Sequence, residues 1–174
     1  MKSKYIYKYC SNCGELFDKK SKTFYVCPKC DFRIFVSPKP AVGLFLFNDQ
    51  GKLLLLTRSI DPGKGLFGIP GGFINPDEST IDALRREVKE EISIEIENAE
   101  YFGSFYGNYE YKGINYKTID IIYKYQLKNG QVIKINDDES SEFSFYNIND
   151  ILIESIGTED VKKAVIELIQ SKLH

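Results

Sequence analysis

Residues 72–94 read GFINPDESTIDALRREVKEEISI, and this stretch decides the fold prediction. At 100° per residue, four aliphatic side chains fall within about 80° of arc and form one buried stripe; they are Ile81, Leu84, Val88 and Ile92. Ser79, followed three residues later by Asp82, is typical of a helix N-terminus, because the serine oxygen can accept from a backbone N–H of the first turn. The stretch therefore predicts an amphipathic helix over residues 79–92, after a loop rich in glycine and proline at residues 61–72.

Three glutamates border that buried stripe. Glu87, Glu90 and Glu91 lie within roughly 100° of one another on the helix. Lys89 projects to the other side and cannot neutralise all three. Like charges three or four residues apart disfavour a helix by a few tenths of a kcal/mol each, whereas a hard divalent cation such as Mg²⁺ or Mn²⁺ would turn the repulsion into attraction. Helix geometry alone leaves two interpretations open, a divalent-metal site and an ordinary solvated acidic face.

The spacing of the fixed positions resembles the Nudix box, GX5EX7REUXEEXGU, in which U is an aliphatic residue. The matching positions are Gly72, Glu78, Arg86, Glu87, Val88, Glu90, Glu91 and Ile94. The preceding GIPGG, residues 68–72, also resembles the loop of that family. One position departs, because Ser93 stands where the family has glycine. Since that glycine ends the helix, the departure bears on the local turn and on no metal ligand.

The resemblance covers residues 41–174 and implies an α/β/α sandwich with a mixed sheet. It also implies metal-dependent hydrolysis of the pyrophosphate bond in a nucleoside diphosphate linked to another group. The catalytic set that it implies comprises Glu87, Glu90, Glu91, Arg86 and Glu142, with the carbonyl of Gly72 joining the three box glutamates as a ligand of Mg²⁺ or Mn²⁺. In that set Arg86 orients the glutamates by ion pairing, and Glu78 supports the loop. Glu142, with Glu139 as the alternative, is the expected loop acid that accepts a proton or holds a further metal.

All four cysteines lie in the first 30 residues as two CxxC pairs, Cys10 with Cys13 and Cys27 with Cys30. A glycine follows the first pair and a proline lies inside the second, which suits tight turns. Four thiolates from two such turns supply the tetrahedral set that a structural Zn²⁺ prefers. Two disulfides are the competing interpretation, but nothing in the sequence indicates export. We therefore expect zinc.

A site with four cysteine ligands is closed, because it leaves no open position for substrate or water. We expect it to hold together a segment too small to fold alone. Nucleic-acid binding is the alternative, since lysines make this segment basic; they are Lys2, Lys4, Lys8, Lys19, Lys20, Lys22 and Lys29. The prolines of Ser37-Pro38-Lys39-Pro40 predict a stiff, extended linker. The predicted domains are accordingly a zinc ribbon at residues 1–38 and a Nudix hydrolase domain at residues 39–174.

The rest of the chain alternates strands with helices. Residues 41–47 and 52–57 are apolar runs on either side of an Asn/Asp/Gly-rich turn and predict a β-hairpin. Segments rich in Tyr, Phe and Ile predict further strands; they are residues 101–106, 117–127 and 142–146. Near the end, aliphatic residues recur at helical spacing and predict a C-terminal helix packed on the sheet; they are Val161, Val165, Leu168 and Ile169. This pattern predicts the α/β class.

A zinc ribbon in front of a Nudix domain resembles the NADH pyrophosphatase branch of that family. That branch has an SQPWPFP-like signature after the box, whereas residues 104–110 read SFYGNYE and the chain has no tryptophan. We favour an ADP-containing dinucleotide or ADP-ribose as substrate, with Arg58, Tyr106 and Tyr109 as substrate-binding residues. The alternatives are a non-catalytic nucleotide- or nucleic-acid-binding module and an RNA 5′-end pyrophosphohydrolase. The three box glutamates favour an enzyme.

Composition excludes several classes of protein. In 174 residues, 43% are hydrophobic and 28% charged, which is typical of a globular chain, and the net charge of −2 gives no overall attraction to nucleic acid or to anionic membranes. His174 is the only histidine, which leaves no plausible base for a Ser-His-Asp or Cys-His mechanism. The apolar runs are far shorter than the roughly 20 residues that span a bilayer, and the N-terminus lacks a signal-peptide pattern. We expect a cytoplasmic protein whose partner is a small nucleotide, with a homodimer left open.

Overall fold

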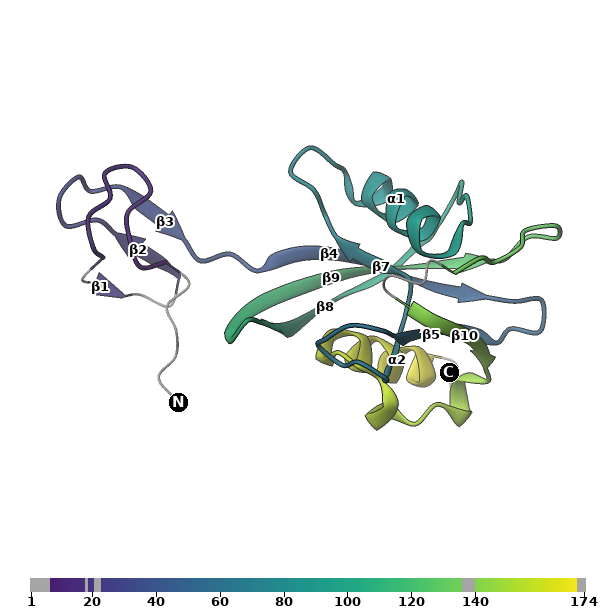
Figure 1. Cartoon of the computed structure of the whole chain (residues 1–174). Coiled ribbons are helices and arrows are strands. Elements are labelled where there is room, and N and C mark those ends of the chain that lie inside the picture. The colour runs from purple at the N-terminus through teal and green to yellow at the C-terminus, as the bar shows by residue number, and fades with distance from the viewer. Residues whose placement is uncertain (1–6, 18, 21–22, 136–139, 172–174) are drawn as a thin grey trace.

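The computed structural model describes residues 7–17, 19–20, 23–135 and 140–171, and Glu139 and His174 lie outside these ranges. A small antiparallel sheet opens the chain, with strands in the order β1 (Lys19–Lys20), β2 (Phe24–Val26) and β3 (Arg33–Phe35). Figure 1 shows this small sheet joined to the larger body by one extended segment. The predicted boundary at residue 38 falls between β3 and β4 (Lys39–Phe47).

The body contains a seven-stranded mixed sheet. Its main path runs β10 (Ser140–Tyr146), β5 (Leu53–Arg58), β4, β9 (Ile114–Gln126) and β8 (Glu100–Tyr111). Neighbours on this path are antiparallel except β4 and β9, which are parallel. The sequence predicted the hairpin of β4 and β5, and the Asn48 side chain holds its turn by accepting from the backbone N–H groups of Gln50 and Lys52.

Two helices cover opposite faces of this sheet, as Figure 1 shows. The helix α1 (Thr80–Ile92) packs on one face through Leu84, Val88 and Ile92, all fully buried. The helix α2 (Glu159–Ser171) packs on the other face against Phe45 and Leu55. The predicted α/β/α sandwich with a mixed sheet is confirmed. Neither of these two helices, in the part of the chain that the structure describes, is long and apolar enough to cross a membrane.

The hairpin of β8 and β9 is longer than the predicted strands. The pattern predicted strands at residues 101–106 and 117–127, whereas pairing continues to Tyr111 and Ile114. Between them, Lys112 and Gly113 both have positive φ, of 49° and 75°, so that a two-residue turn of this kind closes the hairpin. Tertiary pairing thus extends both strands through a polar, tyrosine-rich stretch.

The glycine-rich loop contains two short strands, β6 (Phe67–Gly68) and β7 (Gly71–Phe73), which pair with β5 and β4. Gly71 has φ of 146°, and a Cβ at this position would lie 2.1 Å from the carbonyl oxygen of Val42. Only glycine therefore lets β7 approach β4 so closely. This approach places the start of the box beside the sheet.

Candidate functional site

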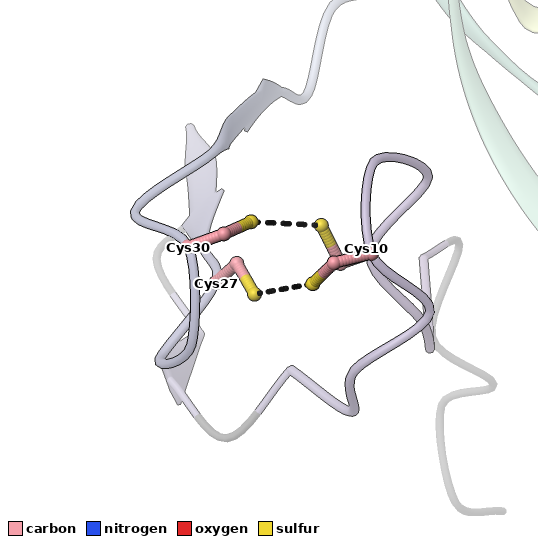
Figure 2. A group of neighbouring side chains, drawn as sticks. Cys10, Cys27 and Cys30 are labelled. Atoms are coloured by element: carbon pink, nitrogen blue, oxygen red, sulfur yellow. Dashed lines mark hydrogen bonds between the residues drawn. The ribbon is translucent and has the colours of Figure 1, made fainter.

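The four cysteine sulfurs form one compact cluster beside the small N-terminal sheet (Figure 2), and all lie within 4.8 Å of one another. The Sγ atoms of Cys10 and Cys30 are 3.7 Å apart, and those of Cys13 and Cys27 are 3.5 Å apart. A disulfide requires about 2 Å, so these cysteines are free thiols. With Zn–S bonds of about 2.3 Å, a tetrahedral site has S···S edges of about 3.8 Å. The cluster therefore fits Zn²⁺.

The two cysteine turns have the same backbone pattern. The carbonyl of Cys10 accepts from the N–H of Gly14, and that of Cys27 accepts from the N–H of Asp31. Gly14 and Asp31 both have positive φ, of 75° and 56°. The side-chain amide of Asn12 donates to the Cys30 sulfur at 3.6 Å, and this bond lowers the pKa of Cys30 to about 6. A lowered pKa favours the thiolate, which is the form that binds a metal.

Helix α1 begins and ends as its sequence predicts. The Ser79 oxygen accepts from the backbone N–H of Asp82 at 3.3 Å, which completes the N-cap. At the other end Ser93 has φ of 58°, and its N–H donates to the carbonyl of Lys89. The serine therefore adopts the left-handed conformation that the family's glycine normally supplies. The turn is kept.

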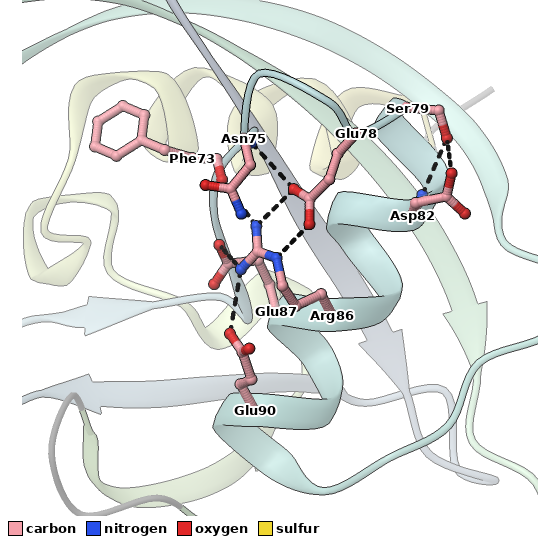
Figure 3. A network of polar contacts seen from close by, with 8 residues as sticks. All are labelled: Phe73, Asn75, Glu78, Ser79, Asp82, Arg86, Glu87 and Glu90. Carbon is pink, nitrogen blue, oxygen red and sulfur yellow. Dashed lines mark hydrogen bonds and ion pairs between the residues drawn. The ribbon is translucent and has the colours of Figure 1, made fainter.

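Arg86, in the middle of this helix, is the centre of a polar network (Figure 3). Its Nε and Nη2 donate to the two carboxylate oxygens of Glu78, at 2.6 and 2.9 Å. Its Nη1 donates to Glu87 and Glu90, at 2.7 and 3.1 Å, and Nη2 also donates to the carbonyl of Phe73. All five guanidinium donors are thus used. The bond from Arg86 lowers the pKa of Glu78 to about 2.

Glu87 and Glu91 point from the helix toward β7. Glu91 is buried and accepts from the N–H of Gly71 at 2.9 Å. The side chain of Glu87 is only 13% exposed. A Cβ at Gly72 would lie 2.6 Å from the Glu87 carboxyl carbon. Gly72 is therefore the residue that makes room for this carboxylate.

These two glutamates line a cleft of about 210 Å³. Arg58 of β5 and Tyr109 of β8 line it as well, and Arg58 Nε donates to the carbonyl of Pro62 at 2.8 Å. The Tyr109 ring meets Phe73 edge to face, with centroids 5.3 Å apart. The cleft therefore combines two carboxylates, a cation and an aromatic ring.

The donor set fits a hard, partly hydrated divalent cation. Glu87 and Glu91 offer carboxylate oxygens to a cleft with room for several waters, given about 30 Å³ per water. Among the residues that the structure describes, the cysteines form the one close cluster of potential ligands, so the box glutamates are not gathered around one point. Glu90 accepts from Arg86 Nη1 at 3.1 Å, and its side chain is 59% exposed.

A second cavity, of about 100 Å³, shares Arg58, Gly72 and Tyr109 with the cleft. It is lined by Asp120 of β9 and Asp160 of α2, neither of which was predicted from the sequence. Burial, with repulsion by Asp160, raises the pKa of Asp120 to about 8. The sequence does indicate that Asp120 is unusual, since this residue interrupts an otherwise apolar run.

Four predicted site residues do not line the cleft: Arg86, Glu90, Tyr106 and Glu142. Tyr106 is 68% exposed and packs on Lys163, with the ammonium 3.4 Å from the ring centroid. Glu142 pairs with Thr57 in the sheet, is exposed, and accepts from the Thr57 hydroxyl at 3.4 Å. It lines neither cavity, and its role as the loop acid stays a prediction. The roles assigned to the box residues also stay predictions.

Comparison with known proteins identifies the class of protein that this fold and site define. The family model for the NUDIX domain matches residues 37–168. The chain belongs to this family, as the box residues indicated.

Relatives show the same architecture. The chain is 26% identical over 147 residues to a protein of Pseudomonas fluorescens Pf0-1 called "NAD-capped RNA hydrolase NudC", covering 83% of this chain and half of that relative. It matches the NUDIX domain of Shewanella oneidensis NrtR complexed with ADP ribose with a TM-score of 0.63 and 25% identity, over 80% of this chain and 91% of that one. A NUDIX hydrolase of Nitrosomonas europaea has the same fold, with a TM-score of 0.69 and 23% identity over 91% and 88% of the two chains.

Proposed function

We propose that the protein hydrolyses the pyrophosphate bond of a nucleoside diphosphate linked to another group, with an ADP-containing dinucleotide or ADP-ribose as substrate. The proposal rests on one observation: Glu87, Glu91, Arg58 and Tyr109 line a single cleft. A diphosphate needs positive charge, and a nucleoside needs an apolar planar surface. The cleft offers both beside carboxylates suited to a divalent metal.

Each residue has a distinct task in this proposal. Mg²⁺ or Mn²⁺, held by the box glutamates with the carbonyl of Gly72, would neutralise the diphosphate oxygens and lower the pKa of a bound water. Arg86 holds Glu78, Glu87 and Glu90 in place before substrate binds, because its five donors are already engaged. Such preorganisation reduces the reorganisation needed during the reaction.

Arg58 and Tyr109 bind the substrate. The bond from Arg58 Nε to the Pro62 carbonyl fixes the side chain beside the cleft, where the guanidinium can pair with phosphate oxygens. Tyr109 lines both cavities and can stack on a base or pack against a ribose. Tyr106 would act farther out, on the face that carries Lys163.

The relatives support this class of substrate. One is named for acting on NAD-capped RNA, and a second, structurally similar domain is complexed with ADP ribose. Both ligands contain an adenosine diphosphate linked through its terminal phosphate. The chain spans half of the Pseudomonas relative. The proposal therefore names the bond that is cleaved, the pyrophosphate bond, and the substrate panel distinguishes a free dinucleotide from an RNA-linked one.

The test is a panel of NADH, NAD⁺, ADP-ribose, nucleotide sugars, nucleoside triphosphates and capped RNA, each with Mg²⁺ or Mn²⁺. We expect AMP from the dinucleotides or from ADP-ribose. Glu90→Gln should remove this activity. Glu95→Gln, the same change on an exposed side chain just beyond the helix, is the matched control and should not. Absence of AMP from every ADP derivative with the wild-type protein would overturn the proposal.

A further inference from the structure

The N-terminal ribbon presents an aromatic face to solvent. In the hairpin of β2 and β3, Tyr25 and Ile34 point inward and pack with Cys10 and Cys27. Side chains alternate along a strand, so Phe24 and Phe35, which pair across the two strands, occupy the opposite face. Phe35 is 65% exposed. A hairpin face that met only water would be expected to carry polar residues.

Three planar groups lie next to one another on this face. The Arg33 guanidinium lies 5.8 Å from the centroid of the Phe24 ring, within the range of a cation–π contact. The Phe24 ring in turn lies 6.2 Å from that of Phe35. Rings of this kind stack on nucleobases, and an adjacent guanidinium pairs with phosphates. We call Phe24, Arg33 and Phe35 the ribbon platform.

Charge is divided unequally between the two parts of the chain. Residues 1–38 contain eight lysines and arginines and three acidic residues, for a net charge of +5. Residues 39–174 contain 15 basic and 22 acidic residues, for a net charge of −7. Even with Zn²⁺ and four thiolates, which together add −2, the ribbon remains positive. A polyanion would therefore be repelled by the body and attracted to the ribbon.

We propose that the ribbon platform binds single-stranded nucleic acid. Unpaired bases expose the ring faces that Phe35 can stack against, whereas a duplex hides them. Two ribbons of this charge repel each other, which disfavours pairing of two platforms. An anionic lipid surface offers charge but no ring to stack.

Binding of a strand to the ribbon also has a consequence for catalysis, which rests on the proposed function. A strand held on the ribbon would bring a diphosphate at its 5′ end to the same molecule that cleaves it. Such tethering raises the effective concentration of the end at the cleft. Binding to the platform itself does not depend on hydrolysis.

The experiment measures fluorescence anisotropy of a labelled oligonucleotide of about 12 nucleotides, within the usual site sizes for single strands. RNA and DNA of the same sequence are compared, using zinc-loaded protein without added Mg²⁺. We expect Phe35→Ala to weaken binding about tenfold, the low end of what a lost stacked base costs, and Phe35→Tyr to retain it. Arg33→Gln should lower the slope of log affinity against log salt by about 0.7.

Tyr101→Ala is the matched control, because Tyr101 is an aromatic residue of the body that is 58% exposed. It should leave binding unchanged. Dinucleotide hydrolysis should remain at the wild-type rate in Phe35→Ala, and zinc content should remain at one per chain. If wild type hydrolyses the dinucleotide but Phe35→Ala and Arg33→Gln bind both oligonucleotides as wild type does, the platform inference is wrong. If the protein binds anionic vesicles but no oligonucleotide, the platform binds a lipid surface instead, and the proposal is wrong. If it forms a Phe35-dependent dimer but binds no oligonucleotide, the platform is a dimer interface, and the proposal is also wrong.

Discussion

The carboxyl pair of Asp120 and Asp160 should make the free energy of unfolding depend on pH. Burial, with repulsion by Asp160, raises the pKa of Asp120 from 3.8 to about 8. Asp160 is 4% exposed and accepts from the Thr118 hydroxyl at 2.8 Å, so the pair cannot easily separate. Between pH 4 and pH 8 the folded pair therefore keeps a proton that the unfolded chain has released.

The number of protons bound by the folded and unfolded states determines whether stability rises or falls with pH. Where the folded state binds one more proton than the unfolded state, stability falls by about 1.4 kcal/mol for each pH unit. This contribution is fully present below the unfolded pKa and is lost as pH rises through the folded pKa. From pH 5 to pH 7 the loss amounts to about 3 kcal/mol.

Asp120→Asn removes the titration and nearly preserves the shape. We expect the variant to gain stability relative to wild type by about 1.4 kcal/mol per pH unit from pH 5 to pH 7. Urea unfolding followed by far-UV circular dichroism at pH 5, 6 and 7 measures this difference. Asp49→Asn, in the exposed turn between β4 and β5, is the control and should give a constant difference. A difference between Asp120→Asn and wild type that does not change with pH would refute the reasoning.

The remaining predictions concern the helix and the two metal sites. Glu90→Gln should lower the rate of hydrolysis about 100-fold or more with the fold intact, because it replaces a hard anionic ligand by a neutral amide of the same shape. Turnover within a few-fold of wild type at saturating metal would contradict the role assigned to Glu90. Ser93→Gly should raise the free energy of unfolding by about 0.5–1 kcal/mol, since Ser93 holds a φ of 58° that favours glycine; an unchanged denaturation midpoint would show that the turn is unstrained. Mild EDTA should stop hydrolysis and Mg²⁺ alone should restore it while about one zinc stays bound per chain, because the cysteine site is closed. Cys27→Ser should lower the melting temperature, and a selective loss of hydrolysis without loss of stability would instead place the ribbon in the active site.

Local spacing along the chain determined much of the site. The α1 stripe, its Ser79 cap and the box spacing depend on contacts within about four residues, so the pattern predicted the helix and the order of Glu87, Glu90 and Glu91 along it. The two CxxC pairs likewise predicted a four-sulfur cluster, because each turn presents two thiols to one metal. Packing of one turn against the other then places Cys10 beside Cys30 and Cys13 beside Cys27.

Only the tertiary structure decided what faces the cleft. Arg58, Tyr109 and Ser140 come from β5, β8 and β10, and no local pattern joins them to the box. A β-bulge separates Ser140, paired with Arg58, from Glu142, paired with Thr57. Simple alternation would place Glu142 on the face of Ser140, and the extra residue turns it to the other. Asp120 of β9 and Asp160 of α2 meet between the sheet and the helix from positions 40 residues apart, because long-range packing rather than sequence spacing brings these two carboxyl groups together.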